Sequence, residues 1–117
     1  MKITVIQQDI AWKDVHTNIS RIEALVAQAE RSDLYIFPEM CSTGFSLKPQ
    51  GMAEKVNGET VERMLSWAVK YDAAFAGSVM TVDDQGRYYN RMYFVRPDGI
   101  VQHYDKCNLF IYSGEDK

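Results

Sequence analysis

The sequence predicts an α/β fold in which helices pack on a mixed β-sheet. Short apolar segments alternate with segments of helical periodicity over residues 2–82, in the order β-α-β-α-β. Such an order implies right-handed crossovers between parallel strands. Tight turns at residues 83–86 and 97–99 then separate two further apolar strands, which adds antiparallel pairs to the sheet.

The first part of this pattern is a strand, a helix and a strand. Residues 2–8 form the first strand, because they are rich in β-branched side chains. The helix begins near Asp14 or Thr17, which are candidate N-caps, and runs to about Arg31. Its apolar positions recur with the helical repeat: Ile19, Ile22, Leu25, Val26 and Ala29. Residues 33–37 form a short strand that is apolar almost throughout, as in a strand covered on both faces.

The remaining elements follow a long loop. Residues 40–58 show weak periodicity and several glycines, which predicts a long loop, and such loops in compact domains are usually either functional or disordered. A second helix is expected over residues 59–71, with one apolar face: Val61, Met64, Leu65 and Ala68. Three strands complete the pattern, at residues 73–82, 88–96 and 100–106. In the 88–96 strand, Met92, Phe94 and Asn90 are expected to share one face.

Length and charge narrow the classes of protein that the chain can represent. A chain of 117 residues forms one domain at most. Its net charge of −3 argues against a nucleic-acid partner, because such proteins carry a basic surface. No apolar run reaches the roughly 18 residues of a membrane span. The amino terminus lacks the apolar core of a signal peptide, so a cytoplasmic location is expected.

Cysteine and histidine usage predicts no metal site. Cys41 and Cys107 have no second cysteine or histidine at the spacing of a metal site. They also suggest no disulfide framework. His16 and His103 are isolated in the sequence, and each is expected to be a solvated surface residue.

Glu39 and Lys106 are the strongest candidates for chemistry, because each follows an apolar strand directly. A partly desolvated carboxylate at Glu39 suits a general base, and an ammonium at Lys106 can stabilise negative charge on a reacting carbonyl. Structural alternatives stay open: a carboxylate that caps backbone donors, and a lysine that extends to water. Glu115 lies in a polar stretch, where it would ordinarily be a surface residue.

Neither cysteine is favoured as the nucleophile that would complete such a pair. Neighbouring residues of a strand point to opposite faces, so Cys107 points away from a site into which Lys106 points. Cys41 enters the long loop, and a cysteine there is most often a small buried apolar residue. A thiol enzyme that uses either residue is a minor alternative.

Several motifs, taken together, resemble one known family. The glutamate motif of the nitrilase, or carbon–nitrogen hydrolase, superfamily is similar to FPEM at residues 37–40 and STGF at 42–45. Its lysine motif is similar to YDK at residues 104–106, which Leu109 and Phe110 follow. Further similarities are Trp12, Asp14 and Asn18 in the first loop and helix, and Asn90-Arg91 and Pro97-Asp98-Gly99 in the central hairpin. The order matches from Met1 to Glu115, and the glutamate segment looks most like that of omega-amidases.

The resemblance implies an amidase that works without metal or cofactor on a small-molecule amide bearing a carboxylate. Glu39 would be the general base, Lys106 would stabilise the oxyanion, and Glu115 would help to position substrate and lysine. A cysteine beyond Lys117 would be the nucleophile. Residues 1–117 would then be the N-terminal part of an α-β-β-α sandwich, a partial carbon–nitrogen hydrolase domain that is truncated before its nucleophile and inactive alone.

Two further implications concern partners and alternatives. Members of the superfamily often dimerise, so a homo-oligomer is a candidate assembly. The main alternative is a shortened relative without catalytic activity, kept as a binding or assembly module. In that case Glu39 and Lys106 would be structural charges.

Overall fold

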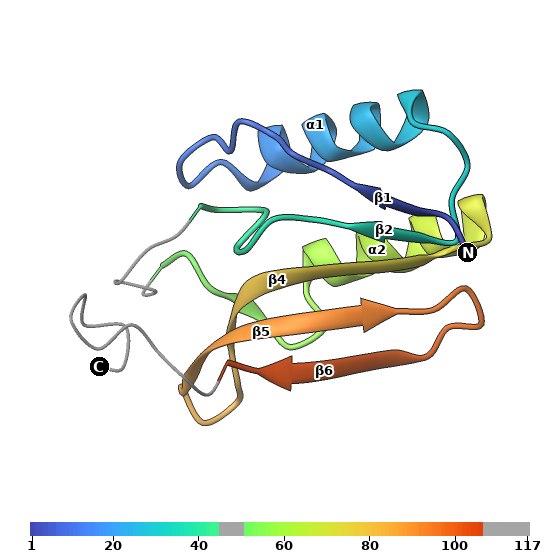
Figure 1. Cartoon of the computed structure of the whole chain (residues 1–117). Coiled ribbons are helices and arrows are strands. Elements are labelled where there is room, and N and C mark those ends of the chain that lie inside the picture. Colours follow the sequence, from blue (N-terminus) through green and yellow to red (C-terminus); the bar gives the residue numbers. More distant parts are fainter. Residues whose placement is uncertain (45–50, 107–117) are drawn as a thin grey trace.

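A computed structural model of the chain describes residues 1–44 and 51–106 (Figure 1). The described residues form one mixed sheet of six strands with two helices. In chain order these elements are β1 (Ile3–Val5), α1 (Val15–Gln28), β2 (Leu34–Ile36), β3 (Glu54–Lys55), α2 (Glu59–Tyr71), β4 (Ala74–Val82), β5 (Tyr88–Val95) and β6 (Val101–Asp105). The predicted α/β class and element order are confirmed. The addition is β3, which lies inside the segment predicted as loop.

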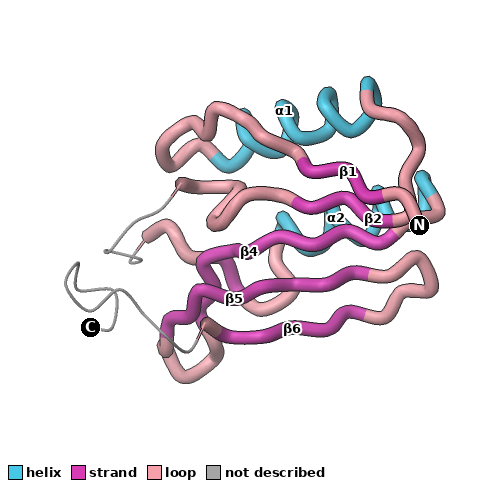
Figure 2. Tube along the Cα trace, viewed as in Figure 1, coloured by secondary structure: helices cyan, strands magenta, loops and turns pink. Residues whose placement is uncertain are grey.

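The order of the sheet brings the ends of distant strands together. Its main path is β1-β2-β4-β5-β6, and β3 pairs with β4. β1, β2 and β4 are parallel, whereas β4–β5 and β5–β6 are antiparallel. Two reversals restore the original direction, so β6 runs the same way as β2. The opposed arrows of β5 and β6 are visible in Figure 1, and Figure 2 shows β4, β5 and β6 side by side. The carboxyl ends of β2 and β6 therefore lie at the same end of the sheet.

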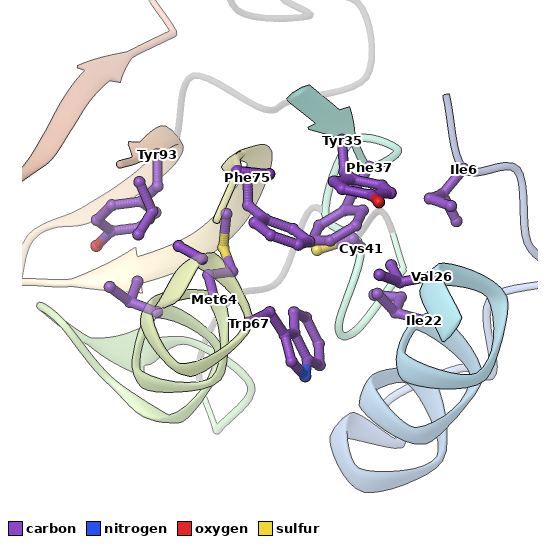
Figure 3. Packing of buried hydrophobic residues seen from close by; sticks show 14 of the residues in the cluster. Ile6, Ile22, Val26, Tyr35, Phe37, Cys41, Met64, Trp67, Phe75 and Tyr93 are labelled. Carbon is purple, nitrogen blue, oxygen red and sulfur yellow. The ribbon is translucent and has the colours of Figure 1, made fainter. Parts of the chain in front are cut away.

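Both helices pack on one face of this sheet, where the main core lies. α1 buries Ile19, Ile22 and Val26, and α2 buries Val61, Met64, Trp67 and Ala68. Figure 3 shows these helices on the same side of the aromatic residues of the strands. Tyr35 and Phe75 stack with ring centroids 4.8 Å apart, and Phe37 meets Trp67 edge to face at 5.9 Å. Such aromatic pairs add specific geometry to the burial of apolar area.

A glycine in β4 allows the close packing at this core. A Cβ atom at Gly77 would lie 3.0 Å from Cβ and 3.1 Å from Cδ2 of Phe37. Contacts this short are not tolerated without movement of the neighbour, so the missing side chain is what lets Phe37 lie against β4.

The opposite face of the sheet has no helix over it among the described residues. Strand register places these apolar side chains on that face together: Ile3, Val5, Met92, Phe94 and Tyr104. Asn90 shares this face, as predicted, whereas Tyr93 and Val95 point into the core. One helical layer on one sheet is half of an α-β-β-α sandwich. No helix of the described part of the chain is long and apolar enough to cross a bilayer.

Candidate active site

The segment that carries Glu39 is built on β4. Past the end of β2, the backbone N–H of Phe37 donates to the carbonyl of Ala76, at 2.7 Å. Ser78 then holds the next turn twice: its hydroxyl accepts from Met40 N–H at 2.8 Å, and its carbonyl accepts from Cys41 N–H at 3.1 Å. These bonds fix the backbone on the C-terminal side of Glu39 to a buried strand.

The C-terminal part of the same turn is held by hydrogen bonds from the start of α1 and from the segment before it. The Asn18 side chain, which is fully buried, donates to the carbonyl of Ser42 at 2.8 Å and also to that of Ala11. Gln8 donates to the carbonyl of Cys41 at 3.2 Å. Because these carbonyls are satisfied by side chains, the turn needs no regular secondary structure to hold its shape.

Lys106 is placed by the last rung of the β5–β6 ladder. Its backbone N–H donates to the carbonyl of Asn90 at 3.0 Å. On the opposite face, Arg91 forms a two-pronged ion pair with Asp105, at 2.7 and 3.1 Å. Arg91 is only 7% exposed, and its hydrogen bond to Asp105 raises the pKa of the guanidinium. This partly buried pair fixes the strand directly before Lys106.

The two predicted residues meet at the carboxyl end of the sheet. Lys106 Nζ lies 3.3 Å from Glu39 Oε1, although 67 positions separate the residues in the chain. Asn90 Nδ2 donates to the same oxygen at 2.6 Å. Among residues 1–44 and 51–106, Glu39 accepts hydrogen bonds from these two side chains, and the ammonium of Lys106 is paired with a carboxylate. The catalytic roles of the two residues stay predictions.

Glu39 is partly exposed to solvent. Its side chain is 49% exposed and that of Lys106 is 30% exposed, so about half of the surface of the Glu39 side chain is in contact with water. The cause is local: Glu39 lies past the strand, on the outer side of a turn whose neighbours Met40 and Cys41 point inward. Water and a small substrate can therefore reach this carboxylate.

Cys41 has the opposite setting. Its side chain is fully buried in the main core, and burial, with a smaller effect from the charge of Glu54, raises the pKa of the thiol to about 12. A thiol with such a pKa is almost entirely protonated near neutral pH and is a poor nucleophile. The expectation that Cys41 is a small buried apolar residue is confirmed.

Glu115 and Cys107 lie outside the described residues, so their roles stay predictions. The described residues contain no group of three or more side chains suited to holding a metal ion. Sequence reasoning gave Asn90 no role of its own and missed Ser78 altogether. A signal for Ser78 exists in retrospect: it is a polar residue, 5% exposed, within the apolar run of β4.

Comparisons with known proteins identify the family and agree with the fold. Residues 2–117 match the family model for carbon-nitrogen hydrolases. The omega-amidase YafV of Yersinia enterocolitica is 34% identical over an alignment of 117 positions, which covers 98% of this chain and 44% of the relative. A (R)-stereoselective amidase of Pseudomonas sp is 35% identical and covers 94% of this chain and 41% of its own length. The chain thus spans less than half the length of these relatives.

Solved structures show the same relationship in three dimensions. XC1258 from Xanthomonas campestris, a CN-hydrolase superfamily protein, superposes with a TM-score of 0.91 at 35% identity, covering 99% of this chain and 44% of its own. An N-terminal amidase with a Gln-Val peptide reaches a TM-score of 0.85 at 24% identity over 98% of this chain and 30% of its own, which shows a shared fold. Together with the match over residues 2–117, these findings show that the chain belongs to the carbon–nitrogen hydrolase family.

Proposed function

We propose that this chain supplies the general base and the oxyanion-stabilising lysine of an omega-amidase-like site. The observation that carries the proposal is the contact between Glu39 and Lys106, 3.3 Å apart at one end of the sheet. The substrate would be a small amide that also bears a carboxylate, in line with the relatives that are named omega-amidases. Amide hydrolysis in general is supported by the family itself.

The chemistry follows from the positions of the two groups. Glu39 would take the proton of a cysteine thiol, and the thiolate would attack the amide carbon. Lys106 would stabilise the negative charge that develops on the carbonyl oxygen. As this intermediate collapses, the C–N bond would break and protonated Glu39 would return its proton to the leaving nitrogen, so that ammonia is released and a thioester remains. Glu39 would then activate the water that hydrolyses the thioester, giving a free carboxylate and the regenerated thiol. Glu115 would help to position substrate and lysine.

The nucleophile in this proposal is a cysteine outside residues 1–117. The buried thiol of Cys41 supports this, because its pKa of about 12 leaves almost no thiolate near neutral pH. We expect the purified 117-residue chain, verified by intact mass, to release no ammonia from a short keto-acid amide. Steady turnover by that chain would show that residues 1–117 contain a working nucleophile.

A chimera tests the roles of Glu39 and Lys106. In it, this chain replaces the matching N-terminal segment of the Yersinia enterocolitica omega-amidase. We expect the chimera to release ammonia, and Glu39→Gln or Lys106→Met to lower kcat/KM by about 100-fold or more. Matched controls are Glu62→Gln and Lys70→Met, exposed positions of α2 on the helical side of the sheet, which should change it little.

Two outcomes would count against the proposal. Full activity in both the Glu39 and the Lys106 variants would show that neither residue takes part in the reaction. A folded chimera without activity would instead favour the alternative of a non-catalytic relative, in which the two charges are structural.

A further inference from the structure

Asn90 contacts both members of the proposed catalytic pair, through two different groups. Its side-chain nitrogen donates to Glu39 Oε1 at 2.6 Å. Its backbone carbonyl accepts the N–H of Lys106 at 3.0 Å. Asn90 itself lies within β5, opposite Met80 of β4, and is 9% exposed. A single residue on a paired strand therefore sets where both groups lie.

The contacts at Glu39 also distinguish its two carboxylate oxygens. Oε1 accepts from Asn90 and from Lys106. Oε2 accepts no hydrogen bond from residues 1–44 or 51–106. A donor fixed on Oε1 orients the carboxylate and leaves Oε2 to take a proton from an incoming group.

An amide suits this task better than a charged side chain. Glu39 is half exposed and would otherwise sample several rotamers, because packing does not restrain it. A hydrogen bond to a charged acceptor is stronger than one between neutral groups, so one amide N–H can select a rotamer. Since the amide carries no net charge, the carboxylate keeps its negative charge for Lys106 and for the proton.

We propose that Asn90 is a positioning residue: its side chain holds Oε1 of Glu39 within reach of Lys106, while its carbonyl holds the backbone of Lys106. In the reaction, this would present Oε2 to the nucleophile and then to water. That last step rests on the proposed function, whereas the positioning itself is a statement about geometry and can be tested without turnover.

Zero-length crosslinking of the 117-residue chain measures this geometry directly. A water-soluble carbodiimide activates the Glu39 carboxylate as an O-acylisourea, and Lys106 Nζ displaces the urea to form an amide. The net loss of one water goes to the carbodiimide. The reaction needs the two groups in contact, and peptide mapping by mass spectrometry identifies the linked residues. The Lys2–Glu30 ion pair serves as an internal reference, because Lys2 directly precedes β1, Glu30 follows α1, and neither contacts Asn90.

Asn90→Leu removes the donor while keeping a side chain of similar size. We expect the initial rate of Glu39–Lys106 crosslinking to fall by about tenfold or more, as for the loss of one hydrogen bond to a charged group, and the Lys2–Glu30 rate to stay unchanged. Gln102→Leu is the matched control, because it makes the same amide-to-alkyl change at an exposed position of the same face. It should alter neither rate.

Asn90→Asp keeps the shape of the side chain and replaces the donor with a like charge. If Asn90 only filled space, this variant would crosslink Glu39 to Lys106 as the unchanged chain does, and such a result would overturn the proposal. We expect that rate to fall, with part of the Lys106 product moving to the new carboxylate, which the peptide map resolves. An unchanged Glu39–Lys106 rate in Asn90→Leu, with the reference pair intact, would overturn it equally.

The second variant also protects the test against unfolding. Should Asn90→Leu lose the reference crosslink as well, the Asn90→Asp result alone decides the matter. The outcome is independent of the chimera, because no substrate is hydrolysed: a chimera without activity leaves the positioning role standing, and a failed crosslink leaves amide hydrolysis untouched.

Discussion

Two residues apart in the chain, Glu39 and Cys41 illustrate how one turn separates opposite chemical environments. The Glu39 side chain is 49% exposed, whereas Cys41 is fully buried beside the aromatic core. The turn between them contains Met40 in the left-handed region, at φ +48°, and is held by Ser78. This backbone geometry sends the carboxylate to solvent and the thiol inward. Only the first is available for chemistry.

Because the Cys41 thiol is buried, we expect the free energy of unfolding to decrease at high pH. The pKa of Cys41 rises from 9.0 to about 12 on folding, so the unfolded chain loses its proton first as the pH increases. The contribution of the protonated thiol is complete below about pH 9 and is lost between about pH 9 and about pH 12. We expect the free energy of unfolding to fall by roughly 2 kcal/mol more in the unchanged chain than in Cys41→Ala between about pH 8 and about pH 11.

Urea unfolding at a series of pH values measures this difference. Cys107, the tyrosines and the lysines are present in both chains, so their own titration cancels in the comparison. Parallel pH profiles for the two chains would mean that Cys41 ionises in the folded state as it does in the unfolded state.

At the scale of elements, the sequence predicts what depends on long patterns and misses what depends on a few contacts. α2 was predictable because its apolar residues recur over 13 residues, and its bounds are confirmed. β3 was missed because a strand of two residues has no periodicity. The side of the sheet on which Lys106 lies could not be read either. It depends on both antiparallel pairings, and the contact with Glu39 appears only once they are fixed.

The short strand β3 places Glu54 at the start of α2. Gly58, the N-cap residue, offers no side-chain hydrogen bond. Glu54 replaces it: Oε1 accepts from Thr60 N–H at 2.7 Å, and Oε2 accepts from the hydroxyls of Thr60 and Ser42. A carboxylate at this position also interacts favourably with the helix dipole. Glu54 thereby joins α2 to the turn that follows Glu39.

Replacing this cap should weaken the fold. We expect Glu54→Ala to lower the free energy of unfolding by about 1–2 kcal/mol, because an N-terminal donor of α2 and two hydroxyls lose their acceptor. Glu62→Ala removes the same charge from an exposed position in the first turn without these bonds, and should cost only a few tenths of a kcal/mol. Urea unfolding of both variants measures the two losses in the free energy of unfolding. If the losses were equal, Glu54 would act through its charge alone and not through its hydrogen bonds.

For the molecule as a whole, the main asymmetry is between the two faces of the sheet. One face is covered by α1 and α2 and contains the main core. The other presents apolar side chains to solvent in the described part of the chain: Ile3 is 51% exposed, Val5 70% and Met92 41%. Near Glu39 the same face is closed by a small methionine cluster of Met40, Met52 and Met80. The exposed apolar area on this face lies over β1 and over β5 and β6, where Met92 is two positions from Asn90 along the strand.

This asymmetry predicts that the 117-residue chain associates with itself through the open face, because contiguous apolar surface on a sheet favours pairing. In sedimentation velocity, the apparent mass should rise with protein concentration. The double variant Val5→Lys, Met92→Lys should shift this rise to markedly higher concentration, since two buried charges would oppose the contact. Val69→Lys is the matched control: Val69 is 68% exposed on α2, on the helical side, so its replacement should leave association as it was.

Both variants should change the free energy of unfolding by no more than about 0.5 kcal/mol per site, because these positions are largely exposed. If the double variant associated at the same concentrations as the unchanged chain, the contact would have to lie elsewhere. If it associated less and the Val69 variant did not, the open face would be the surface on which another sheet packs.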